Sequence, residues 1–62
     1  MADDIPEELR AALAQDTVAR QAFERMPPSH RREHARYVAE AKRPETRARR
    51  AAKTLETLRS EG

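Results

Sequence analysis

The sequence predicts an all-α protein, a compact bundle of four short helices in one domain that spans residues 1–62. Apolar residues recur at intervals of three and four, which is the spacing of one helix face. Alanine, arginine and glutamate are frequent, and all three are strong helix formers. The one glycine is residue 62, and prolines or capping residues divide the rest into four stretches, at approximately 5–15, 17–26, 30–42 and 45–60.

The first two expected helices have recognisable starts. Asp3 or Asp4 is a candidate cap for the first, and Pro6 and the two glutamates after it suit a first turn. Asp16 is the candidate cap of the second, which Pro27-Pro28 ends because proline disfavours helical geometry in the residue before it. The expected buried faces are Ile5, Leu9, Ala12 and Leu13 in the first helix, and Val18, Ala22, Phe23 and Met26 in the second.

The third and fourth expected helices are separated by Arg43-Pro44. Ser29 is the candidate cap of the third helix. Pro44 suits the first turn of the fourth, with Glu45 favourable beside it. The expected buried faces are His34, Tyr37, Val38 and Ala41 in the third helix, and Ala48, Ala51, Ala52, Leu55 and Leu58 in the fourth.

The core of so short a chain depends on few large side chains. A domain of about 60 residues buries only about 60% of its unfolded surface, so its stability is marginal. Phe23 and Tyr37 are the only aromatic residues, and we expect them to supply most of the core volume together with Met26 and the leucines. There is no cysteine, so neither a disulfide nor a thiolate metal ligand is available.

Residues His30 to His34 have the spelling H-x-x-E-H, which resembles a reversed zinc-protease signature. Two histidines four apart on a helix can reach one metal ion, but a third histidine and any cysteine are lacking. Arg31 and Arg32 would also repel a divalent cation. We therefore expect no metal, no cofactor and no catalytic residues, with His34 half-buried beside Val38.

Charge is distributed unevenly along the chain, with an acidic first part, a basic second part and a last segment, residues 54–62, of net charge −1. Residues 1–24 contain six acidic and two basic residues, a net charge of −4, whereas residues 25–53 contain ten basic and three acidic residues, a net charge of +7. Three interpretations are open: a solvated face, neutralisation of the basic half by the acidic half, or a docking surface for phosphate, nucleic acid or an acidic partner. On a helical wheel Arg47, Arg49, Arg50 and Lys53 are expected opposite Ala48, Ala52 and Leu55.

The chain resembles the helical domain of the YdeI/OmpD-associated, or bacteriocin-protection, family. The opening Ile5-Pro6-Glu7-Glu8-Leu9 and Phe23 ahead of the proline pair are similar to the family pattern. The other matching pieces are Pro28-Ser29-His30-Arg31-Arg32-Glu33, the run Ala41-Lys42-Arg43-Pro44-Glu45-Thr46-Arg47-Ala48-Arg49-Arg50, and Lys53-Thr54. Family members commonly have an aromatic residue where this chain has His34, and this difference favours a packing role over metal ligation.

The resemblance implies a domain without enzyme activity or cofactor, from a family whose name points to bacteriocin resistance and the cell envelope. As a hypothesis, the interaction surface consists of Lys42, Arg43, Thr46, Arg47, Arg49, Arg50 and Lys53, because arginine forks suit carboxylate or phosphate groups. The alternative is that Thr46 or Glu45 helps to start the last helix and that an arginine braces the third.

From these observations we expect a non-catalytic interaction module that binds an acidic protein partner through its basic face, or alternatively a small basic protein that binds nucleic acid. We expect a monomer or a weak homodimer. No apolar run reaches the roughly 20 residues of a membrane span. A cytoplasmic location is expected because no export signal is seen, although the family name suggests the envelope.

Overall fold

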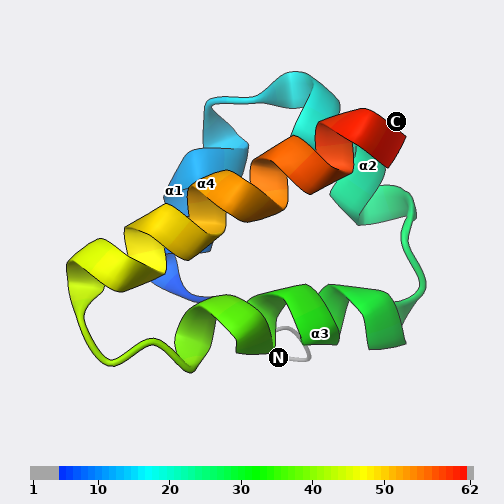
Figure 1. The fold of residues 1–62 in the computed structure, drawn as a ribbon. Helices are drawn as coiled ribbons and strands as arrows, with labels where there is room; N and C mark the ends of the chain where they lie inside the picture. The colour runs from blue at the N-terminus through cyan, green and yellow to red at the C-terminus, as the bar shows by residue number, and fades with distance from the viewer. Residues whose placement is uncertain (1–4, 62) are drawn as a thin grey trace.

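The computed structural model describes residues 5–61, which form four α-helices and no strand (Figure 1). The helices are α1 (Glu7–Ala14), α2 (Thr17–Arg25), α3 (Pro28–Ala39) and α4 (Pro44–Glu61). The all-helical prediction is therefore confirmed, with helix ends displaced by up to three residues from the expected positions. The radius of gyration is 10.4 Å, close to the roughly 11 Å of a compact domain of this length.

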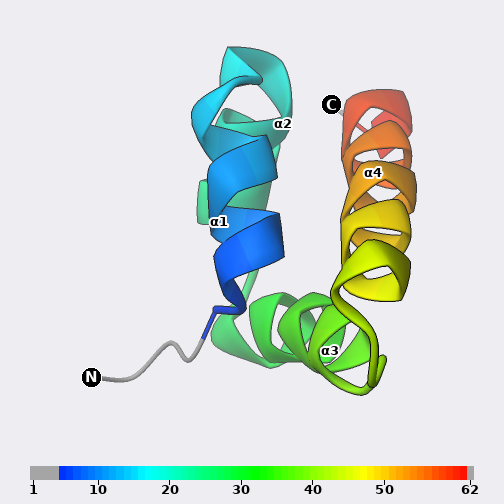
Figure 2. The ribbon, with the colours of Figure 1, turned by 90° about the vertical axis from the view of Figure 1, so that its left-hand side faces the viewer.

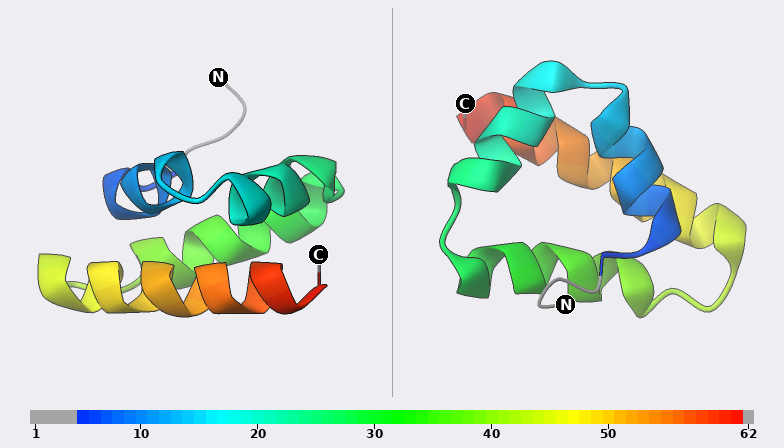
Figure 3. Two further views of the ribbon diagram at one scale, coloured as in Figure 1. Left: turned by 90° about the horizontal axis from the view of Figure 1, so that it is seen from above. Right: turned by 180° about the vertical axis from the view of Figure 1, so that it is seen from behind.

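Helix α4 is the central element, because it packs against each of the other three helices. Figure 2 shows α1 in front of α2, with both helices opposite α4 and α3 crossing below them. Seen from behind (Figure 3, right), α1, α2 and α3 form three sides of a ring that α4 covers from the far side. This arrangement gives the domain one face made by the outer side of α4 and another face bordered by α1, α2 and α3.

The core is formed by one apolar cluster to which all four helices contribute. Its largest fully buried side chains are Leu9, Val38 and Leu58. Phe23 is 4% exposed and lies in the same cluster. Three smaller or less buried members complete it, namely Leu13, Ala19 and Ala51. The expected face of α1 is confirmed, since two of its four residues are buried and the other two pack against the cluster.

The predicted faces of the other helices were partly wrong. Tyr37 was expected in the core but is 39% exposed, and Val18 is 56% exposed. On α4, Ala48 and Ala52 are exposed, and Thr54 is buried instead. The physical reason is that alanine contributes little when buried, so it does not fix how a helix rotates about its axis.

The buried hydroxyl of Thr54 is compatible with the core because it is paired within its own helix. It donates a hydrogen bond of 2.9 Å to the carbonyl oxygen of Arg50, one turn earlier. A threonine that bonds to its own helix in this way buries no unsatisfied polar group. Hydropathy alone would have assigned this position to the solvent side.

Helix starts follow two different rules in this chain. Asp16 is the N-cap of α2, as predicted, and its Oδ1 accepts a 3.1 Å hydrogen bond from the backbone N–H of Ala19. Ser29 is not the cap of α3; Pro27 takes that position and Pro28 is the first helical residue. Proline fits there because its fixed φ is helical and its missing N–H has no partner to lose.

The start of α1 lacks a side-chain cap in the part of the chain that the structure describes. Pro6 occupies the N-cap position, with φ −56° and ψ 149°, and Glu7 and Glu8 fill the first turn. The predicted caps Asp3 and Asp4 lie outside the described residues. The acidic first turn is favourable beside the positive end of the helix dipole.

Candidate interaction surface

The seven residues of the predicted surface lie along the α3–α4 connection and the first ten residues of α4. The structure divides them into two groups. Lys42, Arg43, Arg49 and Lys53 are exposed, whereas Thr46, Arg47 and Arg50 are partly buried. The expectation that Arg47 and Arg50 share the outer arc of the helix was therefore wrong.

Arg47 joins α4 to two other parts of the molecule. Its Nη1 donates hydrogen bonds of 3.1 Å to the carbonyl oxygens of Ala41 and Lys42, which follow the end of α3. Its Nε lies 3.1 Å from a carboxylate oxygen of Glu8 on α1. One guanidinium thus holds the α3–α4 connection and α1 against α4.

Arg50 braces the end of α3 from one turn further along α4. Its Nη1 donates a 2.8 Å hydrogen bond to the carbonyl oxygen of Tyr37. That carbonyl lacks its usual helical donor, because the N–H of Ala41 turns to Val38 where the helix ends. The guanidinium carbon of Arg50 also lies 5.0 Å from the centre of the Tyr37 ring, a cation–π geometry.

Arg31 makes the same kind of contact at the α2–α3 connection. Its Nη1 donates a 2.7 Å hydrogen bond to the carbonyl oxygen of Met26 and a longer one, 3.5 Å, to that of Glu24. Sequence reasoning missed this role. A signal was present, since Arg31 and Arg47 each stand three residues after a proline that begins a helix, in Pro28-Ser29-His30-Arg31 and Pro44-Glu45-Thr46-Arg47.

These contacts replace the glycine that usually ends a helix. A glycine in the left-handed region commonly pairs the last carbonyl groups, but this chain has its one glycine at position 62. Within residues 5–61 no residue has a positive φ. An arginine in the first turns of the next helix reaches back to the free carbonyls instead, so the sequence can turn without glycine.

Two ion pairs connect the acidic residues 1–24 to later parts of the chain, one of them to the basic residues 25–53. One is the Arg47–Glu8 pair, and the other joins Nε of Arg59 to Oδ2 of Asp16 at 2.6 Å. The interpretation that the acidic half neutralises part of the basic half is thereby supported. Within residues 5–61, four of the 13 lysine and arginine residues bind other parts of the domain, so the number of basic residues overstates the cationic surface that is free for a partner.

Both acidic partners have lowered pKa values. A backbone hydrogen bond at the start of α1 lowers the pKa of Glu8, partial desolvation opposes this, and Arg47 lowers it further. For Asp16, the hydrogen bond from the N–H of Ala19 is the main cause of a lowered pKa, against desolvation and with help from Arg59. The folded state thus favours the charged form of both carboxyl groups.

This lowering predicts a loss of stability in acid. The contribution of the two carboxylates is complete above about pH 5, and it declines as the pH falls past their ordinary pKa values of 4.5 and 3.8, because the unfolded chain then binds more protons. We expect the melting temperature to fall more steeply below about pH 5 in the wild type than in a Glu8→Gln/Asp16→Asn variant, in which asparagine still caps α2. Thermal melting measured by circular dichroism across this range tests it. If the melting temperatures of the two proteins fall in parallel with pH, these two carboxylates do not cause the loss of stability in acid.

The two histidines lie on α3, and within residues 5–61 they are not part of a larger group of metal-ligating side chains. His30 is exposed in the first turn of α3, and His34 is partly buried. Among residues 5–61 no group of three or more histidine, cysteine, aspartate or glutamate side chains is placed to hold a metal ion. His34 instead lines a shallow hollow with Tyr37, Lys53, Thr54 and Thr57, between α3 and α4.

The arrangement of four helices clamped by arginines defines a small all-helical domain. Residues 4–61 match OmdA, the family described as bacteriocin-protection, YdeI or OmpD-associated, and the chain therefore belongs to this family. The resemblance inferred from the sequence is confirmed over almost its whole length. No curated protein and no solved structure matches the chain. In residues 5–61 no helix has the length and apolar composition that would let it cross a membrane.

Proposed function

We propose that the protein is a non-catalytic interaction module that binds an acidic region of a partner protein. The binding surface is the exposed part of the predicted set, Lys42, Arg43, Arg49 and Lys53, hereafter the outer basic surface. Arg47 and Arg50 support it by fixing the α3–α4 connection from which its first two residues project.

One observation carries this proposal: four cations in the α3–α4 connection and the first ten residues of α4 remain exposed, while neighbouring arginines bind within the molecule. None of the four side chains makes an ion pair or a hydrogen bond to another residue of the described range 5–61. Arg49 and Lys53 are one turn apart on α4, so they stand next to each other on the helix surface. Cations arranged in this way attract an acidic partner and speed its encounter.

Charge reversal tests the proposal without touching the internal contacts. We expect Arg49→Glu/Lys53→Glu to weaken binding of a polyglutamate peptide by about tenfold or more at low salt. The control is Arg25→Glu/Arg32→Glu, which makes the same charge change at exposed positions on α2 and α3. Amide chemical shifts followed by NMR during the titration give both the affinity and the site. Equal weakening in both variants would mean that only net charge matters, and the outer basic surface would lose its role.

Nucleic acid is the second candidate ligand, and one specific observation favours it. Tyr37 is 39% exposed beside Arg50, next to the hollow that Lys53 also lines. An exposed ring among cations is the usual platform for stacking an unpaired base. Binding of mixed-sequence single-stranded DNA that falls steeply with salt and weakens in Tyr37→Ala would favour this candidate. Retained binding of polyglutamate with no binding of DNA would remove it.

A further inference from the structure

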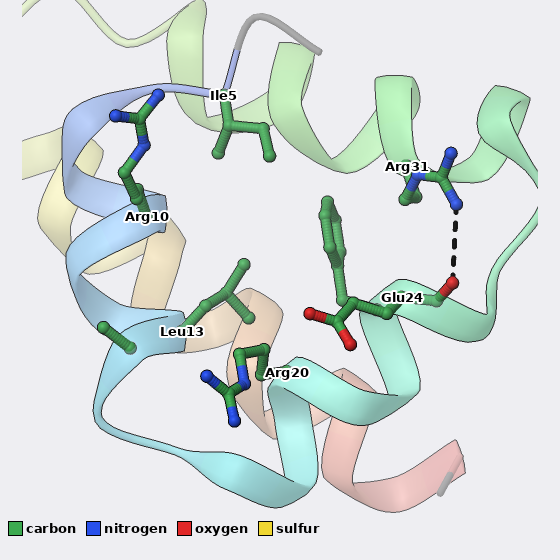
Figure 4. A pocket seen from close by; sticks show the side chains of 8 residues that line it. Ile5, Arg10, Leu13, Arg20, Glu24 and Arg31 are labelled. Carbon is green, nitrogen blue, oxygen red and sulfur yellow. Dashed lines mark hydrogen bonds between the residues drawn. The ribbon is translucent and has the colours of Figure 1, made fainter.

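A hollow of about 330 Å³ opens on the face bordered by α1, α2 and α3, away from the outer side of α4. Its apolar lining includes Ile5, Leu13 and Phe23. In Figure 4 the side chains of Ile5 and Leu13 point into the space between the three helices. The volume is at the lower end of the roughly 300–1,000 Å³ of ligand pockets, which suits one large apolar group better than an extended molecule.

Cationic side chains surround this apolar centre. Arg10, Arg20 and Arg31 line the hollow from α1, α2 and α3 respectively, with Glu24 the one acidic residue among the lining (Figure 4). Three arginines against one glutamate give the rim a net charge of +2. Arg10 and Arg20 are exposed, and neither side chain has an ion pair or hydrogen bond to another residue within 5–61.

We propose that this hollow is a second docking site, one that receives a large apolar side chain from an acidic segment of a partner protein. An apolar centre inside a polar rim is the usual anatomy of a protein interface, and arginine is enriched where such interfaces are strongest. The charge of the rim selects acidic residues on both sides of the inserted group. The site goes beyond the outer basic surface, because its eight lining residues all lie before residue 32, whereas that surface begins at Lys42.

One acidic side chain at the rim, that of Glu24, opposes the binding of an acidic segment. The carboxylate of Glu24 points toward the hollow in Figure 4 and offers the arginines a local negative charge. This negative charge lowers the positive potential of the rim and repels a partner's carboxylates. Removing this charge raises the net charge of the rim by one, so Glu24→Gln is expected to strengthen binding of an acidic segment by at least about twofold.

The test is an NMR titration of the whole chain with a blocked pentapeptide that has phenylalanine between two pairs of glutamates. We expect the amide signals of Leu13, Ala14 and Phe23 to shift. The phenylalanine peptide should bind about tenfold tighter than one with glycine in the middle, because it buries an apolar side chain. Equal affinity of the two peptides, or shifts confined to the outer basic surface, would overturn the proposal.

Two pairs of variants locate the site. Arg10→Gln/Arg20→Gln should weaken binding of the phenylalanine peptide about tenfold, whereas Arg25→Gln/Arg32→Gln, with the same loss of charge at exposed positions outside both surfaces, should leave it nearly unchanged. Ala14→Phe should fill the hollow and abolish the preference for phenylalanine over glycine, while Ala48→Phe at an exposed site on α4 should preserve it. If Ala14→Phe binds like the wild type, the hollow is not the site.

Other occupants give distinct results in the same experiment. If 4-phenylbutyrate shifts the same signals with the affinity of the pentapeptide, the hollow takes a small free carboxylate and not a protein segment. If those signals move on dilution of the protein alone, the occupant is a second copy of the chain. Either result overturns the proposal for the hollow. The function proposed for the outer basic surface is not affected, because the Arg49→Glu/Lys53→Glu variant tests it separately.

Discussion

Replacing Phe23 by alanine is expected to cost about 3–5 kcal/mol of the free energy of unfolding. Phe23 is 4% exposed and is the only aromatic residue in the core cluster of the described chain. Its loss removes apolar burial and leaves a cavity that the surrounding short helices cannot fill. The core of so small a domain rarely supplies more than about 3–5 kcal/mol, so the variant should be largely unfolded at physiological temperature.

Thermal melting followed by far-ultraviolet circular dichroism measures this effect. The matched control is Val18→Ala, which also truncates an apolar side chain on α2 but at a position that is 56% exposed. Its melting temperature should stay close to that of the wild type, since exposed substitutions usually change stability by no more than about 0.5 kcal/mol. Coincident melting of the Phe23→Ala protein and the wild type would show that the core does not depend on this ring.

Local sequence signals predicted the helices well because each acts within a few residues. Proline sets φ at a helix start and disfavours helix in the residue before it, whatever surrounds it. The capping of Asp16 likewise involves only the N–H three residues later. Ser29 was misassigned because two rules competed at the same place: serine is a good cap, but a proline at the first helical position fixes the start two residues earlier.

The rotation of each helix was less predictable, because it depends on contacts from distant parts of the chain. Alanines on several sides of α4 made it unclear from the sequence which face of this helix is buried. Hydropathy predicted that the side chain of Arg47 is exposed. Its long stem packs toward α1 because Glu8 and the carbonyls after α3 need a donor there. Tyr37 lies nearer the surface than predicted for a related reason, since the guanidinium of Arg50 on α4 packs over its ring.

The candidate surface was predictable in composition but not in role. The long basic run correctly indicated where cations concentrate, and four of the seven residues are exposed. Sequence alone could not separate these from the internal clamps, because basic residues of both groups are interleaved within residues 42–53. The repeated spacing from proline to arginine and the lack of internal glycine are the features that distinguish a clamp. An Arg47/Arg50 double variant would therefore disturb the fold and the surface together.

Arg47→Ala is expected to destabilise the domain by about 1–2 kcal/mol through the hydrogen bonds that Arg47 donates to two carbonyl oxygens. These carbonyls follow the end of α3 and the chain offers no glycine turn to pair them, so their donor is lost when the guanidinium is removed. The change corresponds to a fall in melting temperature of about 5–15 °C for a domain of this size.

Two further substitutions show whether Arg47 stabilises the domain through the geometry of its guanidinium or through its charge. Arg49→Ala removes the same charge from an exposed position on the same helix and should change stability by less than about 0.5 kcal/mol. Arg47→Lys keeps the charge but replaces the planar fork with a single ammonium group, which cannot span two carbonyls and a carboxylate in the same geometry. Its melting temperature should lie between those of Arg47→Ala and the wild type. If Arg47→Lys melts like the wild type, charge alone stabilises the α3–α4 connection. If Arg49→Ala lowers the melting temperature as much as Arg47→Ala, the hydrogen bonds of Arg47 have no special role.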